Sequence, residues 1–347
     1  MLETLLEKKA RWLSGEGPEA DIVIESGGTL ARNLADLPFP GQASDDELHN
    51  VLDRVLGAME GHDIFRAGQF FMVEHLEPRV VRFLVERRLI TPDMERARGP
   101  RGVWLSDDQA FSVMVNGRDH VRLQVRSAGF NVDEVWTRLS HADDLLGNVL
   151  DFAFHEKYGY LSASVSEVGT GFGLFALAHL AGLAMSNRVL AESEKARESG
   201  HRIEGLFGPV SEGLGDMFTV ANTATLGRSE EEIQFNLRHL VTGLLESERR
   251  ARQQLHAEGA RALEDRVGRA AGIARGAHLL EFSEALSLLS SLRLGRAMEH
   301  ITDYTYKQLN KTLYAAQPAH LAMRVGQDCD ELTLSMKRAD LFRSTFS

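Results

Sequence analysis

Apolar and β-branched residues gather in short runs along the first two-thirds of the chain, and these runs predict β-strands. Three of them, at 103–105, 111–115 and 120–125, are separated by only a few residues. A parallel crossover needs a dozen residues or more, so runs this close must pair antiparallel. The full set of predicted strands is 20–24, 69–75, 103–105, 111–115, 120–125, 201–207 and 217–221.

Two capping boxes predict where helices begin. Ser44 stands three residues before Glu47, and Ser229 stands three residues before Glu232. At this spacing each side chain can bond the backbone N–H of the other residue. The first helix should run to about Met59. Behind the second box, apolar residues repeat with the helical period of about 3.6, and they are Ile233, Leu237, Leu240, Val241, Leu244 and Leu245.

The remaining pattern is mostly helical. A basic amphipathic helix is predicted before Gly15, and almost the whole chain after 229 is predicted to be helical, with breaks near Gly272 and Pro318. Two further helices are predicted at 132–155 and 174–198. The predicted fold class is therefore α+β, with a largely antiparallel sheet flanked by helices and an all-helical C-terminal region. We place the boundary near residue 255, which gives the predicted domains 1–255 and 256–347.

Composition narrows the function classes. The net charge is −11, from 50 acidic and 39 basic residues. This balance argues against nucleic-acid or acidic-membrane partners. A single cysteine, Cys329, excludes a disulfide or a cysteine-ligated metal site within one chain. The N-terminus lacks the order of a signal peptide, and the longest apolar stretch (174–185, with His179) is too short to span a bilayer. We expect a cytoplasmic protein.

Several stretches, in order and at family spacing, carry a resemblance to a known family. They lie at 21–23, 30–33, 87–92, 119–124, 159–161, 168–171, 211–212, 226–229, 248–249, 263–267 and 292–295. Through them nearly the whole chain resembles the bacterial protein-arginine kinases, which are ATP:guanidino phosphotransferases (phosphagen kinases). The resemblance implies a glutamine-synthetase-like antiparallel sheet with Mg-ATP bound across it. It also implies γ-phosphoryl transfer to a guanidinium, and a helical C-terminal domain that dimerises.

The positions that match the family's phosphate clamp have lost most of their arginines. The family's Ser-Arg-x-Arg pattern corresponds to residues 26–29, so Gly27 and Thr29 replace two arginines. Gly173 and Glu204 replace two more, whereas Arg122 matches a phosphate-binding arginine that survives. A charge-assisted hydrogen bond contributes roughly 1.5–3 kcal/mol. Losing four arginines should therefore cost about 6 kcal/mol or more, which is about four powers of ten in affinity or rate.

The positions that match the family's acceptor site are altered too. Arg118 stands where the resemblance implies a guanidinium-binding carboxylate, and it would repel that substrate. Glu212 matches the second carboxylate and is retained. Ser164 replaces the reactive cysteine, and Val165-Ser166-Glu167 replaces the Pro-Thr-Asn that follows it.

Arg338 resembles a remnant of the family segment that reads phosphoarginine, although Leu334 and Ser335 stand where that motif has Arg-Asp. A solvated helix face is the alternative interpretation of this segment. The apolar stripe Leu286, Leu289 and Leu292 is interpreted either as a homodimer face or as intrachain core.

Two other signals have structural interpretations. The glycines at 169, 171 and 173 lack the lysine of a P-loop and the spacing of a dinucleotide fold, so they predict a turn. His75, His120 and His179 are predicted to be packed or hydrogen-bonded rather than to bind metal, and no metal site is expected.

Three hypotheses follow. The first is a non-catalytic pseudokinase, acting as a regulatory or scaffold protein on a quality-control or stress-response partner. The second is an active kinase with a rearranged clamp, using Arg32, Arg88, Arg122 and Arg126 for phosphates and Glu212 for the acceptor. The third is a phosphoarginine-binding module built on Arg338.

Overall fold

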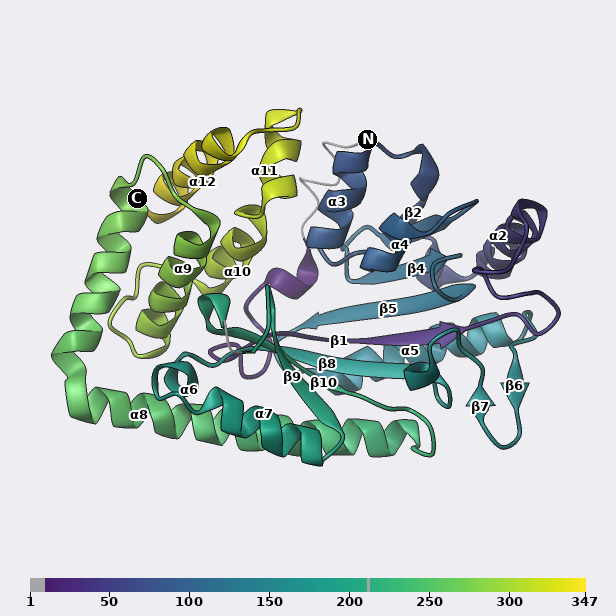
Figure 1. Cartoon of the computed structure of the whole chain (residues 1–347), viewed down its shortest axis with the longest axis horizontal. Helices are drawn as coiled ribbons and strands as arrows, with labels where there is room; N and C mark the ends of the chain where they lie inside the picture. The colour runs from purple at the N-terminus through teal and green to yellow at the C-terminus, as the bar shows by residue number, and fades with distance from the viewer. Residues whose placement is uncertain (1–9, 211–212) are drawn as a thin grey trace.

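The structure, a computed structural model, describes residues 10–210 and 213–347. Eight strands form one sheet in the order β2-β3-β4-β5-β1-β8-β10-β9 (Figure 1), and each neighbouring pair is antiparallel. Their bounds are β1 Val23–Arg32, β2 Gly68–Met72, β3 Gly102–Ser106, β4 Phe111–Val115, β5 Val121–Ala128, β8 Phe172–His179, β9 His201–Gly205 and β10 Met217–Asn222. A separate two-stranded ribbon is formed by β6 Phe154–His155 and β7 Gly159–Tyr160. The predicted α+β class with an antiparallel sheet is confirmed.

Helices flank the sheet and make up the C-terminal region. Those of the first part are α2 Asp45–Met59, α3 Pro78–Glu86, α4 Pro92–Arg96, α5 Val132–Gly147, α6 Ala181–Met185 and α7 Val189–Glu198. The rest are α8 Glu230–Gly276, α9 Phe282–Ala297, α10 Tyr306–Ala315, α11 Pro318–Val325 and α12 Glu331–Phe346. Both predicted capping boxes are confirmed. The hydroxyls of Ser44 and Ser229 each accept a hydrogen bond from the backbone N–H of the glutamate three residues later, and that glutamate's carboxylate accepts one from the backbone N–H of the serine.

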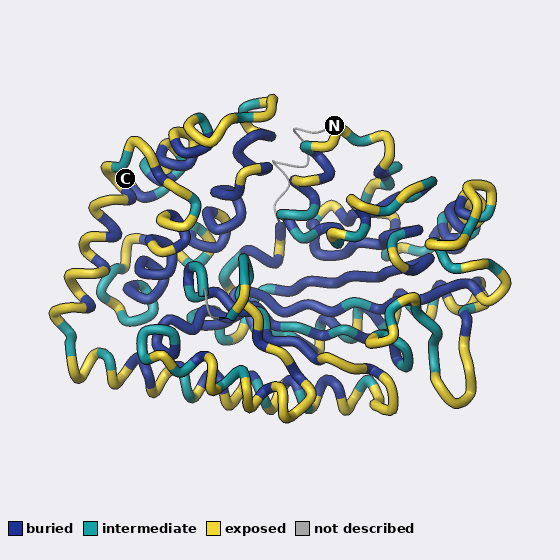
Figure 2. Tube along the Cα trace, in the orientation of Figure 1, coloured by how far each residue is buried: buried dark blue, intermediate teal, exposed yellow. Residues whose placement is uncertain are grey.

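The two faces of the sheet are covered differently. On one face, α2, α5 and the first half of α8 enclose a large apolar core. On the other face, α3, α4 and α11 pack over the β2–β4 side, and a second core joins the sheet to the C-terminal helices. Between these two coverings the middle of the second face carries polar residues. The strands at the centre are dark in Figure 2, whereas the outer surface of α8 is exposed.

Helix α8 crosses residue 255 without a loop. It lies along the sheet and then bends (Figure 1), and its non-helical residue is Gly259 (φ −158°, ψ 44°). Beyond the bend it packs against α9 and α12. In these helices Leu286, Leu289 and Leu292 are buried in the second core, which supports the intrachain interpretation of that stripe.

Two predicted helices are wrong in part. The segment 174–198 was expected to be one helix, but its first part is strand β8, and α6 and α7 follow. Strand β8 is central and mostly buried, so its sequence is a continuous apolar run that resembles a buried helix. The helix predicted at 132–155 ends earlier, because α5 stops at Gly147 and ribbon strand β6 follows.

The first predicted strand is too short. The predicted strand ended at residue 24, whereas strand β1 continues through Gly27 and Gly28 to Arg32. The helix predicted before Gly15 falls largely on residues 1–9, which lie outside the described part of the chain. The residues after them form a short 3-10 turn, η1 Arg11–Leu13.

Candidate functional site

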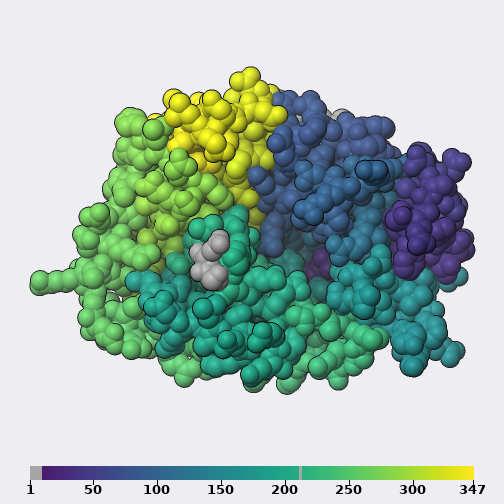
Figure 3. Space-filling model, viewed as in Figure 1, coloured from purple at the N-terminus to yellow at the C-terminus, as the bar shows by residue number. Residues whose placement is uncertain are grey.

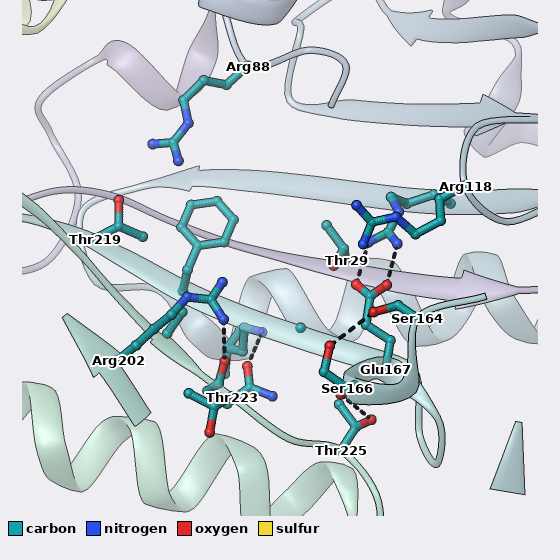
Figure 4. Close-up of a pocket in the computed structure, with 16 residues that line it drawn as sticks. Thr29, Arg88, Arg118, Ser164, Ser166, Glu167, Arg202, Thr219, Thr223 and Thr225 are labelled. Carbon is teal, nitrogen blue, oxygen red and sulfur yellow. Dashed lines mark hydrogen bonds and ion pairs between the residues drawn. The ribbon is translucent and has the colours of Figure 1, made fainter. Parts of the chain in front are cut away.

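A cavity of about 400 Å³ opens on the polar middle of the second sheet face. It brings together eight positions that the sequence singled out: Thr29, Arg88, Arg118, Arg122, Ser164, Ser166, Glu167 and Gly173. Figure 3 shows that the surface is hollowed on this side of the molecule, and Figure 4 shows the side chains that line the hollow.

Strand register explains why residues far apart in sequence meet here. Thr29 of β1 pairs with Gly173 of β8 on one side and with Gln124 of β5 on the other. Side chains alternate between faces along a strand, so every second residue reaches the cavity face. Arg122 of β5 lies two residues before Gln124 and therefore shares that face.

The clamp positions differ in how much space they leave for an arginine side chain. A Cβ on Gly27 would lie 2.4 Å from Cζ of Phe175 and 2.9 Å from the carbonyl oxygen of Val125. The Phe175 ring therefore occupies the space into which an arginine at position 27 would extend. A Cβ on Gly173 would meet only Oγ1 of Thr29, at 2.9 Å. Positions 29 and 173 could accept a longer side chain more easily than position 27.

Arg122 is already neutralised within the chain. Its Nη1 and Nη2 donate to the two carboxylate oxygens of Glu167 at 2.8 and 2.7 Å, and Nη2 also lies 3.4 Å from Asp119. Burial alone would lower the pKa of Arg122, but the hydrogen bonds and charge of Glu167, with Asp119, raise it above its ordinary value. Glu167 thus provides the two oxygens that a phosphate would provide, because planar bidentate pairing suits either anion.

Arg118 lies on the same side of the cavity as Glu167 (Figure 4). It is exposed, on the turn between β4 and β5, and its backbone N–H donates to Asp93 at 3.1 Å. Within the described residues its guanidinium makes no hydrogen bond or ion pair. The position that the resemblance assigns to a carboxylate therefore presents a free positive charge.

Two further arginines reach in from the opposite side (Figure 4). Arg88 lies 3.5 Å from Glu25, and its guanidinium carbon is 5.5 Å from the centre of the Phe175 ring. Arg202 donates to the carbonyl of Asn222 at 3.2 Å and lies 3.2 Å from Glu204. Arg202 was not predicted from the sequence. Its signal was the alternation of β9, which puts residue 202 on the same face as residue 204.

The structure does not bring Arg32 and Arg126 to this cavity. Arg32 is buried, pairs with Asp143 at 2.7 Å and lies 3.6 Å from the centre of the Tyr160 ring. Arg126 is 2 % exposed, pairs with Glu25, and lies 3.9 Å from the Trp12 ring. Both arginines are committed to structural ion pairs.

The retained acceptor carboxylate is not described. Glu212 lies outside the described residues. Ser164 does line the cavity, and its hydroxyl lies 3.0 Å from that of Ser166. Hydroxyls of Thr219, Thr223 and Thr225 line the same cavity, and no sequence signal had marked them.

Arg338 lies far from solvent, which makes the solvated-face interpretation wrong. It is 1 % exposed, and its guanidinium donates to the carbonyls of Ala316 at 2.9 Å and Leu280 at 2.8 Å. It therefore ties α12 to the end of α10 and to the loop before α9.

The prediction of packed or hydrogen-bonded histidines is confirmed for His120 and for His179, whose Nε2 lies 2.9 Å from Oγ of Ser290. It is wrong for His75, which is exposed and whose side chain makes no hydrogen bond within the described residues. His120 is buried, accepts a hydrogen bond from the Leu34 N–H at Nδ1 and donates from Nε2 to the Pro38 carbonyl, each at 3.0 Å. Burial lowers its pKa. Gly169 and Gly171 have positive φ (117° and 66°), as a turn into β8 requires.

The donor set does not reproduce a clamp for Mg-ATP. Among residues 10–210 and 213–347, no group of three or more His, Cys, Asp and Glu side chains is placed to hold a metal ion. Glu167 lines the cavity, but both of its oxygens are engaged by Arg122. Of the five family clamp positions, Gly27, Thr29 and Gly173 carry no charge, Glu204 carries a negative charge, and Arg122 is paired with Glu167. The residues present therefore do not fit a bound Mg-ATP. Nor does any helix in the described part have the length and apolarity to cross a bilayer.

The chain matches two family models. One, described as "ATP:guanido phosphotransferase, C-terminal catalytic domain", matches residues 50–251. The other, described as "Protein-arginine kinase McsB C-terminal domain", matches residues 260–347.

Relatives and solved structures agree with these matches. The chain is 39 % identical to a protein-arginine kinase of Moorella thermoacetica, over 97 % of both chains. It is 36 % identical to one of Symbiobacterium thermophilum, over 99 % of both. The fold is similar to a lombricine kinase (TM-score 0.60, 21 % identity, 71 % of this chain and 70 % of that one). It is equally similar to a duplicated taurocyamine kinase of Schistosoma mansoni (TM-score 0.60, 21 % identity, 67 % of this chain and 34 % of that one). The chain therefore belongs to the protein-arginine kinase family of ATP:guanidino phosphotransferases.

Proposed function

We propose that this protein is a non-catalytic member of the family, a pseudokinase that regulates or scaffolds a protein partner in the cytoplasm. The observation that carries the proposal is the bidentate Arg122–Glu167 pair, with oxygens at 2.8 and 2.7 Å. The arginine that matches the family's phosphate ligand is balanced by the protein's own carboxylate. A nucleotide phosphate would have to displace that carboxylate before binding.

The acceptor side supports the same proposal. An incoming guanidinium would meet the free cation of Arg118 where the family has an anion. At about 4 Å and an effective dielectric of about 20, two like charges repel by about 4 kcal/mol. Such repulsion opposes guanidinium binding at the distance at which transfer must occur.

A rival function is an active kinase with a rearranged clamp. Four arginines do line the cavity, namely Arg88, Arg118, Arg122 and Arg202. This set differs from the one predicted from sequence, because Arg32 and Arg126 are buried elsewhere. Only Arg118 of the four lacks a partner within the described residues. The rival therefore requires arginines to leave their carboxylates before they can bind phosphate.

The test is to rebuild the site. We would prepare Thr29→Arg with Gly173→Arg, Arg118→Glu and Glu167→Gln in one protein, and leave Gly27 alone because Phe175 fills its space. The phosphoarginine formed on a protein substrate with Mg-ATP is measured by mass spectrometry. We expect no turnover by the wild type and a gain of at least about 100-fold over background in the rebuilt variant, since several charge-assisted bonds are restored.

A control adds two arginines away from the cavity. Gly57→Arg with Gly243→Arg introduces two arginines at positions where a Cβ meets nothing within 4 Å, and we expect it to stay inactive. Wild-type transfer at a rate comparable to that of the Moorella thermoacetica relative would overturn the proposed function.

A further inference from the structure

The cavity has a charge imbalance at one point. Each of its other arginines lies beside a carboxylate: Arg88 near Glu25, Arg122 on Glu167 and Arg202 near Glu204. Arg118 alone has no such partner among the described residues. Asp93 accepts only from its backbone N–H. Within the part that the structure describes, the guanidinium of Arg118 is therefore an unpaired cation at the cavity, in a chain whose net charge is −11. One monoanionic group would balance it.

A second feature lies beside the cavity. Phe154, Tyr158 and Leu226 are exposed, although each has a large apolar side chain, and all three line a groove of about 220 Å³. Thr225 lines both this groove and the cavity, so the two share a wall. Its hydroxyl donates to the Val168 carbonyl at 2.8 Å, which fixes that wall in place.

An exposed apolar side chain also lies next to cavity-lining residues in the sequence. Val165 is 87 % exposed and stands between Ser164 and Ser166, both of which line the cavity. A small anion bound at Arg118 would make no contact with these apolar side chains. Clustered exposed apolar side chains next to a polar site are typical of a surface that binds protein.

We propose that this cavity receives the carboxylate side chain of an acidic segment of a partner protein at Arg118, with flanking apolar residues of the segment in the groove. The proposal rests on the proposed non-catalytic function and gives the chemistry of its partner. The acceptor side then selects an anion where an active relative would select a cation. The planar guanidinium of arginine suits a carboxylate through two parallel hydrogen bonds.

Charge favours a carboxylate over a phosphate. Arg122 is balanced by Glu167, so Arg118 contributes a single unbalanced charge. A phosphate dianion would exceed it or would have to displace Glu167. Lys157 and Arg228 also line the groove, against one acid, Glu230. This excess of positive charge suits acidic residues beside the anchoring one.

The test uses small probes and needs no nucleotide. The ¹⁵N-labelled full chain is titrated by NMR with N-acetylglutamate α-amide, and then with its glutamine, arginine and phosphoserine counterparts. We expect saturable shifts for the glutamate probe at millimolar concentration, centred on Arg118 and its neighbours. The glutamine and arginine probes should bind at least tenfold more weakly. Arg118→Glu should reverse the order of the glutamate and arginine probes, and Arg250→Glu, on the exposed face of α8, should leave it unchanged.

A second arm tests the groove. A probe that carries phenylalanine near the glutamate should bind at least fivefold more tightly than the short probe. Phe154→Ser or Leu226→Ser should remove that gain.

Several results would overturn the proposal. They are no saturable shift with the glutamate probe, equal binding of glutamate and arginine probes, or binding that persists in Arg118→Glu. Phosphoserine binding more than tenfold tighter than glutamate would replace the carboxylate with a phosphate. Phosphoryl transfer to arginine would overturn the proposed function separately, whichever probe binds.

Discussion

The chemistry of single residues here depends on which carboxylate holds which arginine. Arg32, Arg122 and Arg126 are all buried, and each is paired with an acid. A buried guanidinium without such a partner would cost several kcal/mol. Arg118 is exposed and can remain unpaired because water solvates it.

Glu167→Gln tests the central pair. The change removes the charge that balances Arg122 but keeps the side-chain shape. We expect the affinity for Mg-ATP or inorganic phosphate, measured by calorimetry, to rise about tenfold, because about 1.4 kcal/mol of competition is removed. Glu246→Gln, on an exposed turn of α8, is the matched control and should change nothing. Unchanged affinity in Glu167→Gln would mean that this carboxylate does not compete with phosphate.

The sequence predicted part of this site. Arg122 and the altered positions 29, 118, 164 and 173 do line one cavity. The phosphate-binding role that one hypothesis gave to Arg126 could not be tested from the sequence alone. It shares a face with Arg122, but the strand register places it beside Glu25 and under Trp12, contacts more than 100 residues away in the chain. Arg202 was missed because neither a motif nor a charge run marks it.

At the scale of elements, glutamates of one helix cap the N-terminus of another helix. Glu248 of α8 is buried and accepts from the Gly182 and Leu183 N–H groups at the start of α6. Glu86 of α3 accepts from the Ala319 and His320 N–H groups at the start of α11. An acid at a helix N-terminus satisfies free donors and complements the helix dipole.

Glu86→Ala should weaken the connection between α3 and α11. It removes two bonds to backbone N–H groups, at 3.0 and 3.2 Å, and the 3.1 Å contact with Nδ1 of His320. We expect the free energy of unfolding to fall by about 1–2 kcal/mol, measured by urea denaturation. Glu77→Ala, on an exposed side chain of the same region, should cost less than about 0.5 kcal/mol. An equal loss in both variants would contradict the capping role.

Elements were predictable where a local signal exists. The capping boxes at Ser44 and Ser229 fixed two helix starts, and short connections fixed the antiparallel pairing of β3, β4 and β5. Strand β8 was mistaken for helix, because a buried central strand lacks alternation. The predicted strand ended at residue 24, before Gly27 and Gly28, which lie inside β1. They are glycines because Phe175 lies against one, and Leu139 and Val135 lie against the other.

Across the whole molecule, buried histidines should make stability depend on pH. His179 is fully buried, with Nε2 at 2.9 Å from Oγ of Ser290. Burial, followed by the charges of Arg252, Arg293 and Arg266, lowers its pKa well below 6.5. The folded protein therefore stays unprotonated there while the unfolded chain takes up a proton, so stability is full above about pH 7 and falls below about pH 6.5.

The expected slope is up to about 1.4 kcal/mol per pH unit for His179. Burial also lowers the pKa of His120, His201 and His320, which adds to the same trend. Urea denaturation between pH 7.5 and about 5.5 measures the slope. His179→Gln should lower this slope by up to about 1.4 kcal/mol per pH unit, because one fewer proton is taken up on unfolding. A wild-type stability that is constant over this range would contradict the account.

The homodimer remains a prediction, and its face must lie away from Leu286, Leu289 and Leu292, which are core. Leu279, Leu332 and Met336 are exposed. The Leu280 N–H donates to the Ser335 carbonyl, so the loop before α9 adjoins α12. We predict that Leu332→Asp with Met336→Asp yields a monomer by light scattering, whereas Leu190→Asp, at an exposed site on α7, does not. A monomeric wild type would rule out the homodimer.

The measurement that tests the central claim most directly is calorimetric titration of the purified protein with Mg-ATP, with a phosphoarginine assay on the same sample. The Moorella thermoacetica relative serves as the positive control. We predict no resolvable heat of binding at concentrations that saturate the relative, and no phosphoarginine above background. Clear binding with turnover would contradict the account, because it would mean that the arginines of the cavity release their carboxylates and form a working clamp.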